Sequence, residues 1–193
     1  AQEGGISWMN ARHPHSGGSF IMATAVSDEE EERATRLLKN EFALRDALQD
    51  AWAIRPVAST QYRGRFALVY APFSFDLLAC RAGRAISGIA RFIELAIRIC
   101  VPLRQMHLQN LIHGDIKPGN IFVHRDATCR LGSFGLSTGT AGAFSHARLT
   151  VSGGTPAYMS PEHTTRTQRP VDSRSDLYSL GVVLYELLTG RLP

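Results

Sequence analysis

The side chains best suited to chemistry lie in the segment 111–121. It places a carboxylate, an ammonium group and a carboxamide within six residues, at Asp115, Lys117 and Asn120. Side chains of these types serve acid–base chemistry and the neutralisation of charged groups. Asp and Asn also form turns, and here they flank Pro118-Gly119. The segment alone therefore leaves a chemical and a purely structural interpretation open.

Three further segments follow it in order. They read Ser133-Phe134-Gly135, then Gly154-Thr155-Pro156-Ala157-Tyr158-Met159-Ser160-Pro161-Glu162, then a stretch over 176–190. Together the four segments resemble the catalytic loop, the D-F-G position, the G-T-x-x-Y-x-x-P-E segment and the buried helix of eukaryotic-type serine/threonine protein kinases. Residues 161–163 and 173–181 are also similar to the kinase-like domain fused to hybrid sensor histidine kinases.

The resemblance implies an α+β, bilobal protein-kinase-like fold that is incomplete at both ends. Residues 1–72 would form a truncated, small, β-rich lobe. Residues 73–193 would form a mostly helical large lobe without its last helices. The two lobes together would make one protein kinase domain.

The resemblance also assigns roles to the first segment. Asp115 would accept or orient the proton of the substrate hydroxyl, and Lys117 would neutralise the transferring phosphate. Asn120 would be an oxygen ligand to Mg²⁺, a metal that prefers hard oxygen donors. The cofactors implied are ATP and Mg²⁺, if the site is competent.

The other segments carry supporting roles in the same family. Thr155 would brace the loop beneath a Ser/Thr substrate. Asp176 would accept backbone N–H bonds from the catalytic loop, and His113 is expected to be a packed core residue. Glu162 pairs in this family with an arginine farther downstream, so it is expected to lack that partner here.

One expected cation is missing. The strand lysine that holds the α- and β-phosphates in this family should fall near Ala23 or Thr24, yet the chain has only two lysines, Lys39 and Lys117. The candidate helix glutamate is Glu41. Lys39 lies two residues before it, and such positions on a helix do not face each other. Glu41 is therefore expected to lack its usual partner.

The expected metal-binding carboxylate is missing as well. Ser133 stands where the family has aspartate, and residues 127–161 contain no Asp or Glu. A serine hydroxyl is neutral and a poor substitute for a carboxylate on Mg²⁺. The chain also lacks a G-x-G-x-x-G phosphate loop.

Gly114 is a third departure, because kinases that are switched by loop phosphorylation carry arginine before the catalytic aspartate. Phosphorylation is therefore not expected to order the loop through residue 114. This expectation concerns Thr138, Thr140, Thr150 and Ser152.

Hydrophobic spacing predicts the elements that position these residues. We expect a hairpin over 6–26, a helix over 29–48 capped by Ser27, strands at 55–59 and 65–70, a helix over 86–108, a strand pair at 121–123 and 129–131, a loop over 136–154 and a helix over 176–188. Pro102 lies inside the second helix, where a proline costs about 3 kcal/mol unless the bend is accommodated. The last helix is apolar almost all round, which predicts burial in a core.

Composition excludes several classes of protein. The chain has 193 residues, of which 44% are hydrophobic and 20% charged, so it is globular. Its formal net charge of +4 comes from scattered arginines without an interleaved aromatic patch, which argues against nucleic-acid binding. No apolar stretch reaches membrane-spanning length. Cys80, Cys100 and Cys129 show no disulfide or zinc spacing, so we expect a cytoplasmic, reducing location.

Three functions remain as hypotheses. The first is a degraded pseudokinase that acts as a regulatory or interaction module among other domains of a larger signalling protein. The second is an active ATP-dependent serine/threonine protein kinase. The third is a nucleotide-binding allosteric domain without phosphotransfer. Loss of the strand lysine and the metal-binding aspartate favours the first, and retention of Asp115, Lys117, Asn120 and Thr155 favours the second.

Overall fold

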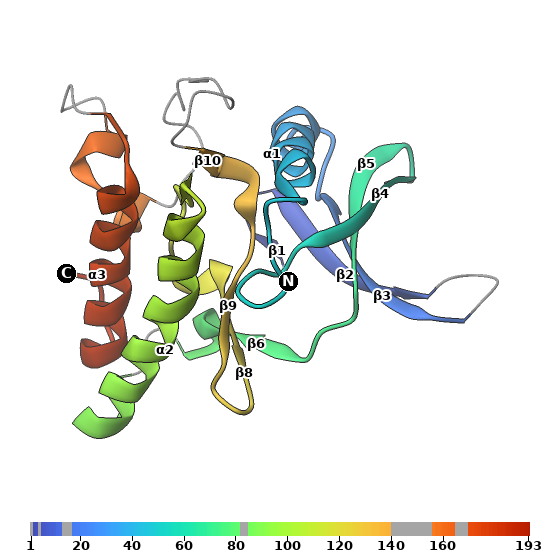
Figure 1. Cartoon of the computed structure of the whole chain (residues 1–193). Helices are drawn as coiled ribbons and strands as arrows, with labels where there is room; N and C mark the ends of the chain where they lie inside the picture. The colour runs from blue at the N-terminus through green and yellow to red at the C-terminus, as the bar shows by residue number, and fades with distance from the viewer. Residues whose placement is uncertain (1, 4, 13–16, 82–84, 140–155, 165–169) are drawn as a thin grey trace.

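A computed structural model of the chain describes residues 2–3, 5–12, 17–81, 85–139, 156–164 and 170–193. A five-stranded antiparallel sheet with one helix forms one lobe, and two long helices with a three-stranded sheet form the other (Figure 1). This arrangement confirms the α+β, two-lobed expectation. No helix in the described ranges is long and apolar enough to cross a membrane.

The small lobe is built on the large sheet. Its strands lie in the order β1-β2-β3-β5-β4; their bounds are β1 Gln2–Glu3, β2 Ile6–Arg12, β3 Ser19–Ala25, β4 Pro56–Tyr62 and β5 Arg65–Tyr70. Strands β2 and β3 confirm the predicted hairpin, although residues 13–16 of its turn lie outside the described residues. Ala23 lies opposite Trp8 on one side and Leu68 on the other. Residues directly opposite share a face of the sheet, so these three side chains face the same way.

Helix α1 covers this face of the sheet and spans Glu31–Leu44, which is shorter than predicted. The predicted Ser27 cap is wrong: Glu30 occupies the N-cap position, without a side-chain cap bond. The chain is still held to the strand end at this point, because Val26 N–H donates to the Gly5 carbonyl at 2.8 Å. The helix buries the side chains at every fourth or third position, Ala34, Leu38, Glu41 and Leu44.

The large lobe contains α2 (Ile89–Leu108) and α3 (Ser173–Thr189), which run side by side (Figure 1). A second sheet has the order β6-β8-β9, and a two-stranded sheet joins β7 to β10; the bounds are β6 Phe75–Leu77, β7 Leu111–Ile112, β8 Ile121–His124, β9 Cys129–Leu131 and β10 Thr138–Gly139. The predicted strand pair is confirmed in β8 and β9. Of the predicted loop over 136–154, residues 140–154 lie outside the described residues, and 138–139 form a strand rather than a loop.

The short connections of the large lobe are 3₁₀ helices. They are η1 Leu78–Arg81, η2 Pro118–Asn120, η3 Phe134–Leu136, η4 Pro156–Tyr158 and η5 Pro161–His163. Both η2 and η5 begin with proline, whose fixed φ suits the first helical position. Helix η2 carries Asn120, so the turn chemistry and the candidate chemistry occupy the same residues.

The two long helices differ from expectation in detail. Helix α2 continues through Pro102, which is buried, so the packing accommodates the missing N–H bond. Helix α3 begins earlier than predicted, because Asp172 and Ser175 form a reciprocal capping box. Its predicted burial all round is wrong: Leu177 is 54% exposed and Tyr178 48% exposed. The opposite side, with Val183 and Leu187, packs in the core.

The cores of the two lobes meet at the cleft. Phe122 of β8 belongs to the large lobe by sequence but packs in the small-lobe core with Ala23, Leu38 and Tyr70. Trp52, which follows α1 in the sequence, packs edge to face on Phe134 with 6.0 Å between ring centroids. The loop between β7 and β8 carries the candidate site, and the strand that follows it packs against the small lobe through Phe122.

Candidate active site

A buried carboxylate anchors the loop that carries the candidate catalytic residues. Asp176 of α3 accepts the backbone N–H of His113 and that of Gly114, both at 2.9 Å. His107 of α2 lies 2.8 Å from the same carboxylate through Nε2. These are the backbone bonds that the family resemblance predicted for Asp176. His107 is an additional partner that the sequence did not indicate.

His113 is a packed core residue, as predicted. It is fully buried, and its Nε2 lies 3.1 Å from the carbonyl oxygen of Gly132. Its ring rests on Phe134 with 5.2 Å between centroids. Burial holds the pKa of His113 below its usual value, which favours the neutral ring. A neutral, enclosed imidazole supports the loop and does not exchange protons with a substrate.

Asp115, Lys117 and Asn120 come together in space. Lys117 Nζ lies 3.0 Å from Asp115 Oδ2, and both side chains are almost buried. The amide of Asn120 donates to the same Oδ2 at 2.8 Å and to the Asp115 carbonyl at 2.7 Å. The turn around Pro118 and the charged cluster are therefore built from the same residues. Asp115 and Asn120 form the turn and also belong to the cluster, so the structural and the chemical interpretation of this segment are compatible.

Ser133 and Gly114 are two of the departures from the family pattern. Ser133 has a left-handed backbone, with φ 65° and ψ 58°, at the start of η3. Gly114 has φ +76°, and a Cβ there would lie 3.0 Å from the Leu136 carbonyl oxygen. An arginine at residue 114 would therefore be strained and crowded. Of the loop residues named as phosphorylation targets, only Thr138 lies within the described residues.

Glu41 of α1 is buried and is held by a phenol. Its side chain is 2% exposed, and its Oε1 accepts the hydroxyl of Tyr70 at 3.0 Å. Burial raises the pKa of Glu41 to about 7, against the smaller opposing effects of the hydrogen bonds from Tyr70 and the Phe134 backbone. The proximity of Glu41 also raises the pKa of Tyr70, after burial itself. The partner of Glu41 is thus a neutral donor from β5.

The positions proposed for the missing lysine do not offer a cation. Ala23 is fully buried against the α1 face of the sheet, and Thr24 points the other way and donates its hydroxyl to Phe66 O at 3.0 Å. Lys39 lies over the ring of Phe66, 5.8 Å from its centroid. The prediction that Lys39 does not serve Glu41 is therefore consistent with the structure.

Two residues of α1 matter to the site and were missed by sequence reasoning. Asn40 donates from Nδ2 to the carbonyls of Gly135 at 2.9 Å and Ser137 at 3.0 Å, which ties α1 to the segment after Ser133. Arg33 lines the same hollow as Glu41. The sequence already indicated that Arg33 lies near Glu41, because positions 33, 37 and 41 are spaced by four and so share one helix face.

A small hollow of about 50 Å³ lies between α1 and the loop. Its polar lining consists of Arg33, Glu41, Asp115, Lys117, Asn120 and Ser133. The structure thus brings together every candidate site residue predicted from the sequence except Thr155, which lies outside the described residues.

The residues present do not fit a Mg²⁺ ion. Mg²⁺ requires near-octahedral oxygen coordination, commonly with one or two carboxylates. Here Asp115 Oδ2 already contacts Lys117 and Asn120, and position 133 contributes only a hydroxyl. In the described part of the chain, no three His, Cys, Asp or Glu side chains are grouped to hold a metal.

Aromatic rings line the side of the cleft next to this hollow. Trp8 packs on Tyr70 with 4.8 Å between centroids and edge to face on Phe122 at 6.4 Å. Trp8 lines both the small hollow and a second one of about 200 Å³ beside Phe73 and Phe122.

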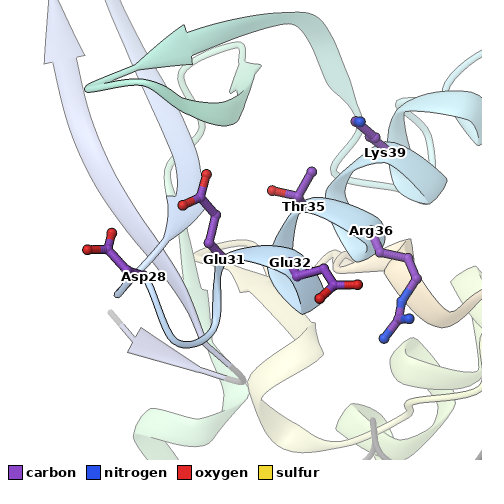
Figure 2. A pocket seen from close by; sticks show the side chains of 6 residues that line it. All are labelled: Asp28, Glu31, Glu32, Thr35, Arg36 and Lys39. Carbon is purple, nitrogen blue, oxygen red and sulfur yellow. The ribbon is translucent and has the colours of Figure 1, made fainter.

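A wider and more open hollow lies on the outer side of α1 (Figure 2). Its side chains are all polar, with acids at the start of the helix and cations farther on: Asp28, Glu31, Glu32, Thr35, Arg36 and Lys39. This order complements the helix dipole. Arg65 of β5 pairs with Asp28 and lies 3.9 Å from Glu31. The charges therefore have a structural explanation as a solvated helix face.

Glu162 has a partner within the chain. Its Oε1 accepts the hydroxyl of Ser175 at 2.6 Å, although the expected arginine partner is farther downstream in the family. Tyr158 donates in a similar way to Glu186 at 2.6 Å. These bonds join η4 and η5 to α3.

Comparison with known proteins agrees with the fold. The two lobes, the anchored loop and the Asp115–Lys117–Asn120 cluster match the arrangement that the family resemblance implied. The sequence profile described as "Protein kinase domain" matches residues 9–193, and the chain belongs to this family. The recognition of a eukaryotic-type serine/threonine kinase domain is therefore confirmed.

Two curated relatives show the range of similarity. The chain is 37% identical over 99 residues to serine/threonine-protein kinase Nek1 of Mus musculus, covering 51% of the chain and 8% of that protein. It is 39% identical over 101 residues to serine/threonine-protein kinase PknB of Mycobacterium leprae (strain TN), covering 52% of the chain and 16% of that protein. The matched part is a small fraction of each relative.

Proposed function

We propose that this kinase domain transfers phosphate weakly or not at all and acts as a regulatory or interaction module in a larger cytoplasmic signalling protein. The observation that carries the proposal is the pairing of Glu41 with the Tyr70 hydroxyl at 3.0 Å, beside a buried Ala23. A buried glutamate with a neutral donor does not position a phosphate-binding cation. Ser133 adds a second deficit, because it places a neutral hydroxyl where the family has its metal-binding aspartate.

The size of the effect follows from the charges lost. Deleting one positioned electrostatic group typically costs about 3 kcal/mol of transition-state stabilisation, or about 10²-fold in rate. Two losses in one site do not simply add, because such groups act as a unit. A rate reduced by several orders of magnitude is the expectation. The partners of such a module are other protein domains, without nucleic acid.

The second candidate is an active ATP-dependent serine/threonine kinase. It is favoured by the compact Asp115, Lys117 and Asn120 cluster, which retains the acceptor, the cation and the amide of the family pattern. Both named relatives are serine/threonine-protein kinases. The third candidate binds ATP as an allosteric ligand without transferring phosphate.

Thermal unfolding and a transfer assay separate the three. ATP is titrated with and without Mg²⁺, and a stabilisation that follows RT ln(1 + [L]/Kd) reports binding. No shift supports the first candidate, and a shift indifferent to Mg²⁺ supports the third. Brisk, Mg²⁺-dependent transfer of labelled phosphate to a hydroxyl acceptor, abolished in Asp115→Asn, would establish the second and overturn the proposal.

A further inference from the structure

Helix α2 carries an apolar side chain at every fourth position of its outer side. Ile89, Ile93, Ile97 and Val101 have this spacing, and they are 63%, 48%, 60% and 50% exposed. Side chains four positions apart lie in one row on a helix, so these four form a continuous ridge. The opposite side of α2 is apolar as well and packs in the core of the large lobe. A helix that is apolar on opposite sides is normally covered on both, which makes the ridge a contact surface.

Two opposite charges lie directly beside this ridge. Glu94 follows Ile93 in the sequence and Arg98 follows Ile97, so both charged side chains lie along the same edge of the ridge. They form an exposed ion pair within α2, with 2.9 Å between Nη2 and Oε1. The two charges are symmetric about position 96, and the four apolar side chains are symmetric about position 95. The ridge and the charges therefore share nearly the same centre of symmetry.

We propose that this side of α2 is a self-association surface, on which two copies of the chain pair their α2 helices antiparallel about a two-fold axis near Ala96. The contact would be isologous, because both copies use the same patch, and it closes after two subunits. Around this axis Glu94 of each copy lies opposite Arg98 of the other, so opposite charges meet twice. None of these side chains lines the candidate site, so the inference goes beyond the proposed function and does not depend on it.

The reciprocal charges favour a second copy in this one orientation. Parallel pairing of the two helices would bring Glu94 against Glu94 and Arg98 against Arg98, so repulsion opposes that alternative. Arg104 is exposed farther along the helix, and in the antiparallel arrangement it lies opposite position 88, before α2 of the second copy begins. Isoleucine and valine have restricted χ1 rotamers in a helix, so covering the ridge costs little side-chain entropy.

Analytical ultracentrifugation of the full chain, over a wide range of protein concentration, tests the proposal. We expect the wild type to form reversible dimers. Glu94→Arg leaves only cations beside the axis and Arg98→Glu leaves only carboxylates, so each variant alone should associate about tenfold more weakly or worse. An equal mixture of the two variants restores opposite charges at both positions. The mixture should therefore form mixed dimers with an affinity close to that of the wild type.

Two neutral changes test the apolar part of the contact. Ile97→Ser removes a central side chain of the ridge and should weaken the dimer about tenfold or more. Leu177→Ser is the matched control, because Leu177 is 54% exposed on another helix, and it should leave the dimer unchanged. Urea denaturation separates a lost contact from a lost fold. All four changes are at exposed positions, so each unfolding midpoint should stay near that of the wild type.

Several results would overturn this surface. They are a chain that stays monomeric at high concentration, a Glu94→Arg variant that associates as well as the wild type, and a mixture that associates no better than its two components. Association that is lost in Leu177→Ser and kept in Ile97→Ser would also overturn it, because the contact would then lie on α3. The presence or absence of phosphate transfer leaves the surface untouched, so its failure and the failure of the proposed function are distinguishable.

Discussion

Glu41→Gln tests the buried carboxyl on which the proposed function depends. Glu41 is 2% exposed, and its pKa is raised from 4.5 to about 7. This rise of the pKa corresponds to roughly 3 kcal/mol, the free energy that ionisation of Glu41 costs the folded state. Glutamine cannot ionise and can still accept the Tyr70 hydroxyl through its amide oxygen.

The sign of the effect follows from proton linkage. Below pH 4.5 the carboxyl is protonated in both the folded and the unfolded chain, so it contributes no pH dependence. Between pH 4.5 and about 7 the unfolded chain loses the proton first, so the free energy of unfolding falls as pH rises. Above about pH 7 the penalty is complete and constant. Glu41→Gln should therefore be more stable than wild type by up to about 3 kcal/mol at pH 8, and not at pH 4.

Urea denaturation of wild type and variant between pH 4 and pH 8 measures this difference directly. The difference between the two proteins cancels the titration of all other groups. Glu32→Gln, an exposed change on the same helix, is the control and should show a flat profile. A Glu41→Gln variant that is less stable at pH 8 would refute the reasoning, because it would mean that a cation stabilises an ionised Glu41.

Three further changes test the rest of the site. Ser133→Asp, which the left-handed backbone tolerates, should make the melting temperature rise with Mg²⁺, whereas the neutral Ser133→Asn should not; equal responses would contradict the assignment of residue 133 to the metal position. Gly135→Ala should cost about 1–3 kcal/mol in urea denaturation, because the new Cβ would lie 2.8 Å from Leu37 Cβ; an unchanged midpoint would show that α1 moves freely. Asp176→Ala should cost about 3–5 kcal/mol, since it leaves the buried N–H groups of His113 and Gly114 without their acceptor, and a cost below about 1 kcal/mol would exclude this anchoring role.

The sequence by itself determined the family, the order of the main elements and the loop chemistry. These features are local: Asp115, Lys117 and Asn120 lie within six residues, and the β8–β9 pair is joined by a short turn. The absence of a strand lysine and of an acidic residue at 133 is also a property of the sequence alone. Local signals failed at the start of α1, where Glu30 and not the predicted Ser27 occupies the N-cap position.

Only the tertiary structure decided what each missing charge is replaced by. The partner of Glu41 is Tyr70, which lies 29 positions away on β5, and Asn40 bonds to Gly135 across 95 positions. Arg33 and Lys117 line one hollow because α1 lies beside the catalytic loop. Hydrophobic periodicity predicts which face of a helix is buried, but it does not predict which distant strand or loop supplies the contacts on that face. Those contacts depend on how the sheet, α1 and the loop pack together, and they set the charge and the pKa values of the site.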